Sequence, residues 1–538
     1  MCKAIDSQER YKVFQLKPKT TRMHEVIKAV TPLTENDFRT TLDMEIKFLI
    51  PADSAAQLLA TNLIKSTLSG NVTTAFEKSI YFDTPRYMLR KNGCSLRIRH
   101  AGDRIGQTLK TETSLGGGVL RRTEISRTLK DSSLDDRLVQ EALKQLSIVK
   151  SARWQFIPLI WTEIKRTKMR LRHRSTSLEL VYNSGYLTCA RHGRRMGQIS
   201  EIEARLISGP AEGMFDFLAR LNEKTSWIQF VTSGSERRFA AISSTHALKP
   251  VKHKPLGIPV DMNSCELLQV SMANALNHFF SNNPQILKAR PEAIHQTRVA
   301  IRRMRAFLRT FKGQIDYMDR KALNGELRWL QTKLGECRDW HVLRADTLPK
   351  IKGLNPELRT ELDELCQRMH RKQLAQALQT YSSRRAQRLI LHLQSWLARQ
   401  PNTGGPSISK QRQSTLKSNM KRLGKLGALT RSRSVTEVHA MRIMVKKIRY
   451  TVEIFPGAED EETRLALQSL ENVQDALGDL NDACKALNLI SVAVNENLSP
   501  GLHVAVRKWA DKRILNCIHR AQPHYKKLLL WARKQQAM

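Results

Sequence analysis

The sequence has no run of about 18 apolar residues, so we expect no membrane-spanning helix. Its N-terminus also lacks the apolar segment of a signal peptide, which predicts a cytoplasmic protein. The eight cysteines are scattered without a CxxC pair, which disfavours a zinc site or a disulfide framework. No Gly-rich phosphate loop of the Walker type occurs, which disfavours nucleotide hydrolysis by that route.

Acidic residues are few beside basic ones. Fifty Asp and Glu stand against 90 Lys and Arg, which gives a formal net charge of +40. Self-repulsion on this scale indicates a polyanionic partner, and nucleic acid, an acidic membrane surface and inorganic polyphosphate all qualify. Aromatic residues make up only 6% of the chain and do not interleave with the basic runs. This disfavours, without excluding, nucleic-acid binding by base stacking.

The 538 residues allow about two to four domains. Residues 1–38 show no periodicity and are interpreted as a mobile extension. Residues 39–245 consist mainly of short alternating runs, with two helix-like segments near 52–69 and 210–224. A Pro/Lys-rich linker covers 246–259. Residues 260–535 have helical periodicity, and a Gly/Pro/Ser-rich break divides them into pieces of about 260–399 and 410–535.

The two helical pieces resemble each other. "IHQTRVAIRRMRAFLRTF" (294–311) parallels "VHAMRIMVKKIRYTVEIF" (438–455), with histidines 144 residues apart. "LGECRDWHV" (334–342) parallels "LGDLNDACK" (477–485), with aspartates 143 residues apart. Two matching segments in the same order at almost the same offset indicate a duplicated helical bundle.

The N-terminal half repeats one charged pattern. In "LDMEIKFLI" (42–50), Asp43, Glu45 and Lys47 occupy alternate positions, so they share one face of a strand. Four further pairs are spaced by two in the same way: Arg97 and Arg99, Thr108 and Lys110, Arg122 and Glu124, and Glu201 and Glu203. Solvent-exposed strand faces are one interpretation. The other is a closed, tunnel-like sheet whose inward carboxylates hold a divalent cation while Arg and Lys hold phosphate oxygens.

The same segments resemble the CYTH superfamily of triphosphate tunnel enzymes. "DMEIK" (43–47) is similar to the ExExK signature, with Asp in place of the first Glu. The motifs that follow in the family's order are "YFDTPRYMLRKNGCSLRIRH" (81–100), "TLKTE" (108–112), "RRTEIS" (121–126), "ELVYNSG" (179–185), "EIEARLISG" (201–209) and "SGSERRF" (233–239). The resemblance implies an antiparallel β-tunnel that binds triphosphate with Mg²⁺ or Mn²⁺.

The resemblance also implies site residues. The catalytic set would be Glu45, Lys47 and Lys110. The substrate-binding set would be Arg97, Arg99, Arg122 and Arg166. The metal-binding carboxylates would be Asp43, Glu45, Glu201 and Glu203.

Several positions depart from the family pattern. Ser126 and Asn183 stand where acids are usual, and Gly234 replaces a lysine. Arg205 follows Glu203 where many members have a third Glu. These changes weaken the positioning of a transition state. Two interpretations therefore stay open, an inorganic triphosphatase and a degenerate tunnel that binds phosphate chains without useful turnover.

The helical half carries a basic helix face in each copy. His295, Arg298, Arg302 and Arg305 fall within a sector of roughly 80°. His439, Arg442, Lys446 and Arg449 repeat this arrangement. A solvated basic face is the alternative interpretation. However, residues 295–311 contain five arginines and no acid, so like charges repel without relief from i,i+4 pairs. This pattern favours an anion site.

Both copies resemble the CHAD domain, a duplicated helical module that binds inorganic polyphosphate in several members. "HxxRxxxRRxR" with "LGxxRD" carries the resemblance in the first copy, and "HxxRxxxKKxRY" with "LGxxND" carries it in the second. Asp339 and Asp482 are interpreted as structural partners of the basic helices. The predicted fold class is α+β, an antiparallel β-tunnel followed by an all-α duplicated bundle. The predicted partners are triphosphate and polyphosphate.

Overall fold

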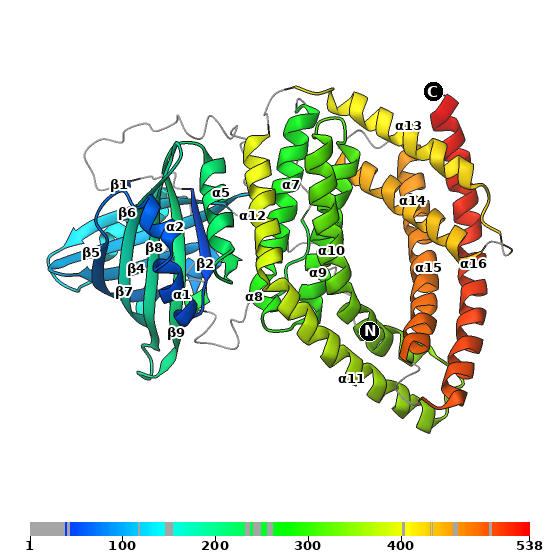
Figure 1. Cartoon of the computed structure of the whole chain (residues 1–538), viewed down its shortest axis with the longest axis horizontal. Helices are drawn as coiled ribbons and strands as arrows, with labels where there is room; N and C mark the ends of the chain where they lie inside the picture. The colour runs from blue at the N-terminus through cyan, green and yellow to red at the C-terminus, as the bar shows by residue number, and fades with distance from the viewer. Residues whose placement is uncertain are drawn as a thin grey trace, which may run out of the picture.

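The protein is described here from a computed structural model of the whole chain. The described residues are 38–39, 44–116, 119–145, 154–231, 237–239, 249–254, 262–400, 404–430, 432, 434–455, 461–493 and 498–537, without the side chains of 38–39, 112–123, 145, 461–463 and 535–537. A β domain is followed by a helical domain (Figure 1), so the predicted fold class is confirmed. None of the helices in these ranges has the length and apolar character needed to cross a membrane.

The β domain is one antiparallel sheet that closes on itself. Its strands are β1 (Phe38–Arg39), β2 (Glu45–Leu49), β3 (Thr73–Asp83), β4 (Cys94–Ala101), β5 (Arg104–Gly116), β6 (Val119–Leu129), β7 (Ile157–His173), β8 (Thr176–Cys189), β9 (Arg195–Ser208) and β10 (Ile228–Phe230). They run in the order β1-β6-β5-β4-β3-β7-β8-β9-β2-β10. The additional pairing of β6 with β2, at Glu45 opposite Leu120, closes the ring. This closure makes the sheet a tunnel.

Strand β2 shows how the alternating pattern is used. Ile46 and Phe48 are buried on the outer face, where they join a core that includes residues of α1 (Ala52–Leu59) and α5 (Ala211–Asn222). Glu45 and Lys47 point to the other face, opposite Arg205 and Glu203 of β9. Because side chains alternate along a strand, burying the apolar face under helices directs the charged face into the tunnel. The remaining helices of this domain are α2 (Asn62–Thr67), α3 (Met88–Lys91) and α4 (Asp136–Gln145).

The helical domain consists of two groups of helices. The first comprises α7 (Ser264–Ser281), α8 (Asn283–Ile286), α9 (Pro291–Thr310), α10 (Tyr317–Val342), α11 (Pro356–Tyr381) and α12 (Arg384–Arg399), and the second comprises α13 (Ile408–Leu426), α14 (Val435–Ile454), α15 (Glu461–Val492) and α16 (Pro500–Ala537). Each group has its own apolar core. Trp340 and Leu362 of the first group share a third core with Ala486 and Leu502 of the second. Helices α9 and α14, one from each group, also contact each other.

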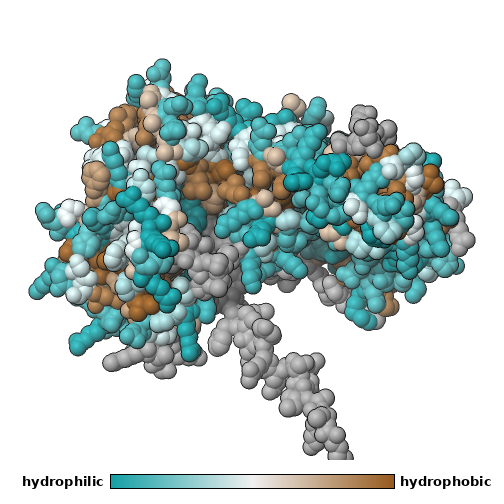
Figure 2. Space-filling view, turned by 90° about the horizontal axis from the view of Figure 1, so that it is seen from below, coloured by the Kyte–Doolittle hydropathy of each residue, from teal (hydrophilic) through white to brown (hydrophobic). Residues whose placement is uncertain are grey.

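The two domains are packed against each other through α5 and α12, and α12 stands between α5 and α7 (Figure 1). Leu391 of α12 is fully buried within the apolar core of the tunnel domain. Asn222 Nδ2 of α5 donates a hydrogen bond to the carbonyl oxygen of Arg384, 2.8 Å away. Seen from below, most of the surface is hydrophilic, and a band of apolar residues crosses the middle of the view (Figure 2). The contact between the domains combines the burial of Leu391 in the tunnel core with hydrogen bonds such as that of Asn222.

Some predicted segments are only partly described. Of the predicted extension 1–38, only Phe38 lies in the described residues, and of the predicted linker 246–259 only 249–254 do. That piece of the linker lies against α7, where the Val251 N–H donates to Asn282 Oδ1, 3.0 Å away. Asp43 and Gly234 lie outside the described residues. The same is true of the side chain of Arg122, whose backbone pairs with Glu112 within the sheet.

Candidate functional site

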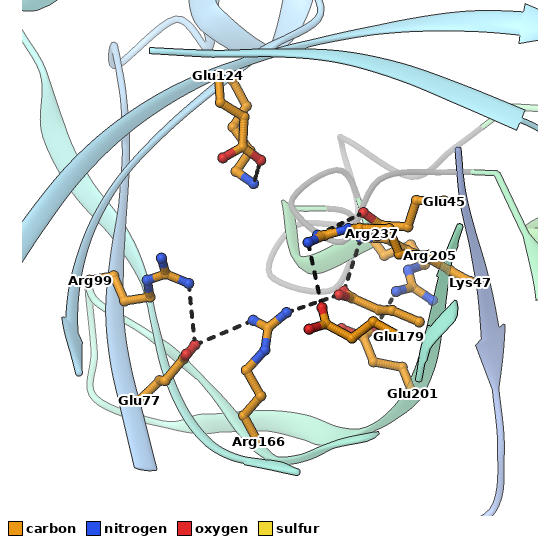
Figure 3. Close-up of polar contacts among 12 residues, drawn as sticks. Glu45, Lys47, Glu77, Arg99, Glu124, Arg166, Glu179, Glu201, Arg205 and Arg237 are labelled. Carbon is orange, nitrogen blue, oxygen red and sulfur yellow. Dashed lines mark hydrogen bonds and ion pairs between the residues drawn. The ribbon is translucent and has the colours of Figure 1, made fainter. Parts of the chain in front are cut away.

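Charged side chains from seven strands converge inside the tunnel (Figure 3). The labelled residues of these strands are Glu45 and Lys47 of β2, Glu77 of β3, Arg99 of β4, Glu124 of β6, Arg166 of β7, and Glu179, Glu201 and Arg205 of β8 and β9. Residues that lie far apart in the sequence therefore meet because the sheet is closed. The interpretation as solvent-exposed strand faces does not hold for these residues.

Lys47 is the centre of one part of this network. Its Nζ lies 3.3 Å from Glu45 Oε1 and 3.2 Å from Glu203 Oε1. The side chain of Glu45 is completely buried, and those of Lys47 and Glu203 are nearly so. A buried carboxylate is stable as an anion only beside a positive charge, so Lys47 holds two of the predicted metal-binding carboxylates together.

Arg166 connects this group to the opposite wall. One of its terminal nitrogens lies 3.1 Å from Glu203 Oε2, and the other lies 3.4 Å from Glu77 Oε2. Arg99 also contacts Glu77, at 3.6 Å. Burial alone would lower the pKa of Arg166, but the charges of Glu203, Glu77 and Glu45 raise it above its ordinary value. Two of the predicted phosphate-binding arginines, Arg99 and Arg166, therefore already hold carboxylate oxygens in the free protein.

Two of the tunnel arginines have hydrogen-bond donors that are not used within the protein. In the part of the chain that the structure describes, the buried Nε atoms of Arg97 and Arg166 have no hydrogen-bond partner. Buried polar groups are normally paired, so such donors indicate a missing ligand or water. An oxyanion in the tunnel would supply the acceptors.

Glu201 has a different environment from Glu203. It forms ion pairs with Arg237 and Arg238, which follow the sheet in the "SGSERRF" segment. Burial would raise the pKa of Glu201, but Arg237, Arg238 and Lys47 lower it below the ordinary value. Arg238 also donates to the hydroxyl of Tyr81 on β3, 3.2 Å away. The structure thus joins this predicted metal ligand to two arginines that sequence reasoning did not select.

Lys110 lies apart from Lys47. It forms an ion pair with Glu124, its register partner on β6, and this pair is drawn away from the Lys47 group in Figure 3. Ser126, one of the departures from the family pattern, donates to Thr108 Oγ1, 3.3 Å away. Lys110 therefore provides a second positive position in the tunnel, separated from the two carboxylates held by Lys47.

Arg205 and Asn183 are two further positions that depart from the family pattern, and their surroundings show the effect of each change. Arg205 contacts Glu45 Oε2 at 3.5 Å and Glu179 Oε1 at 3.6 Å. A guanidinium group therefore lies where a further carboxylate was expected. Asn183 is buried, and its Oδ1 has no hydrogen-bond partner among the described residues. It can still offer a neutral oxygen ligand.

The side chains that could bind a metal ion fit a divalent cation only in part. Among the described residues, no group of three or more His, Cys, Asp or Glu side chains is placed to hold a metal ion. Glu45 and Glu203 nevertheless both direct an oxygen toward one cationic group, the ammonium of Lys47. Mg²⁺ commonly binds to one or two carboxylates together with phosphate oxygens. The residues thus fit a cation that arrives with, or is completed by, a phosphate ligand.

The basic helix faces of the two repeats meet in the helical domain. Arg302 of α9 donates to the hydroxyl of Tyr450 on α14. Burial, together with the charges of Arg442 and Arg302, lowers the pKa of Lys446 to about 7. Lys485 of α15 also acts on Lys446 and forms an ion pair with Asp339 of α10. The repeats therefore create one composite cationic site, which consists of Arg302, Arg442, Lys446 and Lys485.

Other predicted members of the two faces have neighbours of their own. Arg298 donates to the carbonyl oxygen of Gln331, 2.7 Å away, and its guanidinium fills the space beside Gly335 that a Cβ would need. This contact explains the glycine of the "LGECRD" motif. Arg305 donates to Asn324 Oδ1 at 3.1 Å, and Arg449 donates to Glu453 Oε1 at 2.7 Å.

The histidines and one acid of the two motifs lie in the electrostatic field of the basic residues. His295 is half-buried and His439 is exposed, and partial desolvation together with nearby basic side chains lowers the pKa values of both. Asp482 attracts Arg442 and Lys446, as expected for a structural partner of the basic helix.

Comparison with known proteins agrees with this architecture. The CYTH domain family matches residues 42–237, and the CHAD domain family matches residues 271–491. A closed antiparallel tunnel with an inward-facing charge network is thus the CYTH part of the chain. The chain thus contains a CYTH domain followed by a CHAD domain, and the resemblance inferred from its motifs is confirmed.

Individual relatives are distant. Over 146 residues the chain is 27% identical to an inorganic triphosphatase from Haemophilus influenzae, a match that covers 27% of this chain and 40% of that protein. The chain thus spans less than half the length of this curated relative.

Three solved structures are similar to parts of the chain. The CHAD domain from Ricinus communis is 27% identical, with 50% of this chain and 96% of that chain covered and a TM-score of 0.45. HpAC1 from Hippeastrum, described as having a dominant triphosphatase activity, is 18% identical, with 38% and 99% covered and a TM-score of 0.29. PptA from Streptomyces chartreusis is 17% identical, with 51% and 99% covered and a TM-score of 0.39.

Proposed function

We propose that the tunnel binds inorganic triphosphate with a divalent cation, Mg²⁺ or Mn²⁺, and hydrolyses it to diphosphate and phosphate. The helical domain then binds longer polyphosphate chains at its composite cationic site. The observation that carries the proposal is the convergence of Lys47, Arg99, Lys110 and Arg166 with the carboxylates of Glu45 and Glu203 inside one closed sheet. The CYTH family match and the triphosphatase relative support the same reaction class.

The basic and the acidic residues of the tunnel have different proposed roles. Arg97, Arg99 and Arg166 bind oxygens along the phosphate chain, because guanidinium groups bind phosphate through paired hydrogen bonds. Arg122 is proposed for the same role. Lys110 stabilises the negative charge that develops on phosphate oxygens as the bond breaks. Lys47 keeps Glu45 and Glu203 in position. A divalent cation held by these carboxylates, with Glu201 and Asp43 as further proposed ligands, would polarise the phosphoanhydride.

The internal carboxylates suggest how an empty tunnel stays folded. Glu77 lies between Arg99 and Arg166, and Glu124 pairs with Lys110. Each pair neutralises like-charged side chains that would otherwise repel one another in a confined space. Triphosphate would exchange these contacts for phosphate contacts, so binding need not create an uncompensated buried charge.

A tunnel that binds without turnover is the second candidate. Arg205 at a position where many members have an acid, and Asn183 in place of an acid, both reduce the negative charge available to a metal ion. Triphosphate would then be held by the arginines and released unchanged.

Phosphate release distinguishes the two candidates. In wild-type protein with triphosphate and Mg²⁺ or Mn²⁺, we expect steady phosphate release, and Glu203→Gln should lower kcat by about 100-fold because it removes a charge that positions the reacting groups. Glu163→Gln is the matched control, since Glu163 lies on the outer face of the tunnel beside Lys78. If wild type and Glu203→Gln both release phosphate only at the background rate, the triphosphatase hypothesis is wrong.

Metal binding should depend on the phosphate ligand. The protein alone offers the cation few carboxylates, so we expect weak Mg²⁺ or Mn²⁺ binding, and binding at least about tenfold tighter once a non-hydrolysable triphosphate analogue is present. Isothermal titration of the metal with and without the analogue measures the difference. Tight stoichiometric metal binding to the protein alone would contradict this expectation.

A further inference from the structure

Strand β10 is the edge strand of the tunnel sheet and lies directly beside the strand that carries Lys47. In the register of β10 and β2, Phe230 is opposite Lys47 and Gln229 is opposite Phe48. Phe48 is also stacked on Trp227, just before β10, with ring centroids 4.2 Å apart. The position of β2 is therefore set by β9 on one side and, on the other, by β10 at Lys47–Leu49 and by β6 at Glu45.

The free edge of β10 is completed by the helical domain. The backbone N–H of Gln229 donates to Gln387 Oε1 of α12, 3.2 Å away. The carbonyl oxygen of Gln229 accepts from Asn283 Nδ2 of α8, 2.6 Å away. Two side-chain amides thus pair with the backbone N–H and C=O of one residue, as a neighbouring strand would.

These two amides are themselves fixed by a third residue. The hydroxyl of Tyr381 donates to Asn283 Oδ1, and Gln387 Nε2 donates to the carbonyl oxygen of Tyr381, 2.9 Å away. We call Asn283, Tyr381 and Gln387 the amide clamp. Its three residues and Gln229 are buried almost completely. The side-chain oxygen and the side-chain nitrogen of Asn283 and of Gln387 each have a hydrogen-bond partner. The orientation of both amides is therefore determined.

Burial makes the clamp important for the strand. A buried peptide group that loses its partners is destabilised by about 1–3 kcal/mol, so it is either paired or moved to water. Removal of the clamp would leave Gln229 with two such groups. Strand β10 would then move away from the helical domain, and the backbone of Lys47 would lose its fixed neighbour.

We propose that Asn283 and Gln387 of the helical domain are positioning residues for the reaction in the tunnel. They hold β10 against β2 and so place Lys47 and the carboxylates of Glu45 and Glu203. This inference rests on the proposed triphosphatase function. The arginines proposed to bind phosphate lie on β4, β6 and β7, none of which pairs with β10 among the described strands, so the clamp acts on the reacting geometry more than on substrate affinity.

The experiment uses the full chain with Gln387→Met, which keeps the side-chain volume and removes both hydrogen bonds. We expect kcat for triphosphate to fall about tenfold and KM to change by less than about threefold. We also expect amide hydrogen exchange of residues 45–50 to become about tenfold faster in the folded variant. Asn283→Ala removes the other half of the clamp and should give the same pattern, including when Gln387→Met does not fold.

Ser395→Ala is the matched control. Ser395 also joins the two domains, through a hydrogen bond of 3.4 Å to Asp216 of α5, but it does not touch β10. Its kcat and exchange should stay at wild-type values. Unchanged exchange in both clamp variants, or faster exchange with unchanged kcat, overturns the proposal. An inactive wild-type protein overturns the triphosphatase function instead, and hydrogen exchange then decides whether the clamp holds β2.

Discussion

Replacing Lys47 by methionine should lower kcat/KM for triphosphate by at least about 100-fold, which is the scale expected when a group that positions reacting charges is lost. Lys47 contacts both Glu45 and Glu203 inside the tunnel. Without its ammonium group, the two carboxylates repel each other and move apart, so a cation is no longer held at a defined point. Phosphate release at saturating metal measures the change.

Two further variants show whether charge or geometry is lost. Lys47→Arg keeps the positive charge, but its planar group cannot replace a compact ammonium between two carboxylates, so we expect an intermediate activity. Lys78→Met removes a lysine from the outer face, where it pairs with Glu163, and should leave activity unchanged. Wild-type kcat/KM in a folded Lys47→Met protein would refute the proposed site.

Polyphosphate binding to the helical domain should weaken as the pH rises through neutrality. The pKa of Lys446 is about 7 in the free protein because of burial and the charges of Arg442 and Arg302. An anion favours the charged form, so binding above this pH takes up a proton and the affinity falls. We expect about a tenfold loss between pH 7 and pH 8.5. Long chains are the right probe, because their internal phosphates keep a constant charge over this range.

The neighbours of Lys446 do not produce this change. The pKa of His439 is lowered by partial desolvation and by its cationic neighbours, so that residue stays neutral above pH 7. The pKa of Asp482 is raised by burial, but it starts from an acidic value. Lys446→Arg should therefore bind with little pH dependence, while Lys447→Arg should keep the wild-type profile. An unchanged profile in Lys446→Arg would assign the proton to another group.

Competition between polyphosphate and DNA at matched salt tests the nucleic-acid alternative.

The alternating segments predicted much of the tunnel, because period two is a local property that survives in the sequence. Glu45, Lys47, Arg99, Lys110 and Glu203 all project into it as expected. Strand β7 was not predicted as a strand, although Arg166 on it was selected from the family resemblance. Buried and exposed residues alternate in each half of β7, but the buried face changes from even-numbered to odd-numbered residues in the middle of the strand, which obscures the period in the sequence.

The partners inside the tunnel could not be predicted. Glu77 meets Arg166 because β3 and β7 are neighbours, although these two strands are separated by three others in sequence. Strand order and register depend on the whole sheet and not on any one segment. Arg237 and Arg238 lie in a motif that was noted, but nothing local indicates that their partner is Glu201.

The helical half shows the same limit. The periodicity placed Arg298, Arg302 and Arg305 on one face, and all three lie on α9 as expected. A helical projection gives only the direction of Cβ, and long side chains then follow the nearest acceptors. Arg298 and Arg305 consequently turn to α10, while Arg302 meets α14. That α9 and α14 face each other follows from the packing of the two repeats.

Leu391 has a consequence for how such proteins evolve and how they can be engineered. It belongs to the helical part of the chain, yet its side chain completes the apolar interior of the tunnel part. A module exchanged at the linker would bring a foreign surface to this position and leave an ill-fitting gap beneath α5. Recombination between relatives is therefore constrained far from the crossover point, and a functional chimera must carry a matching residue more than a hundred positions downstream.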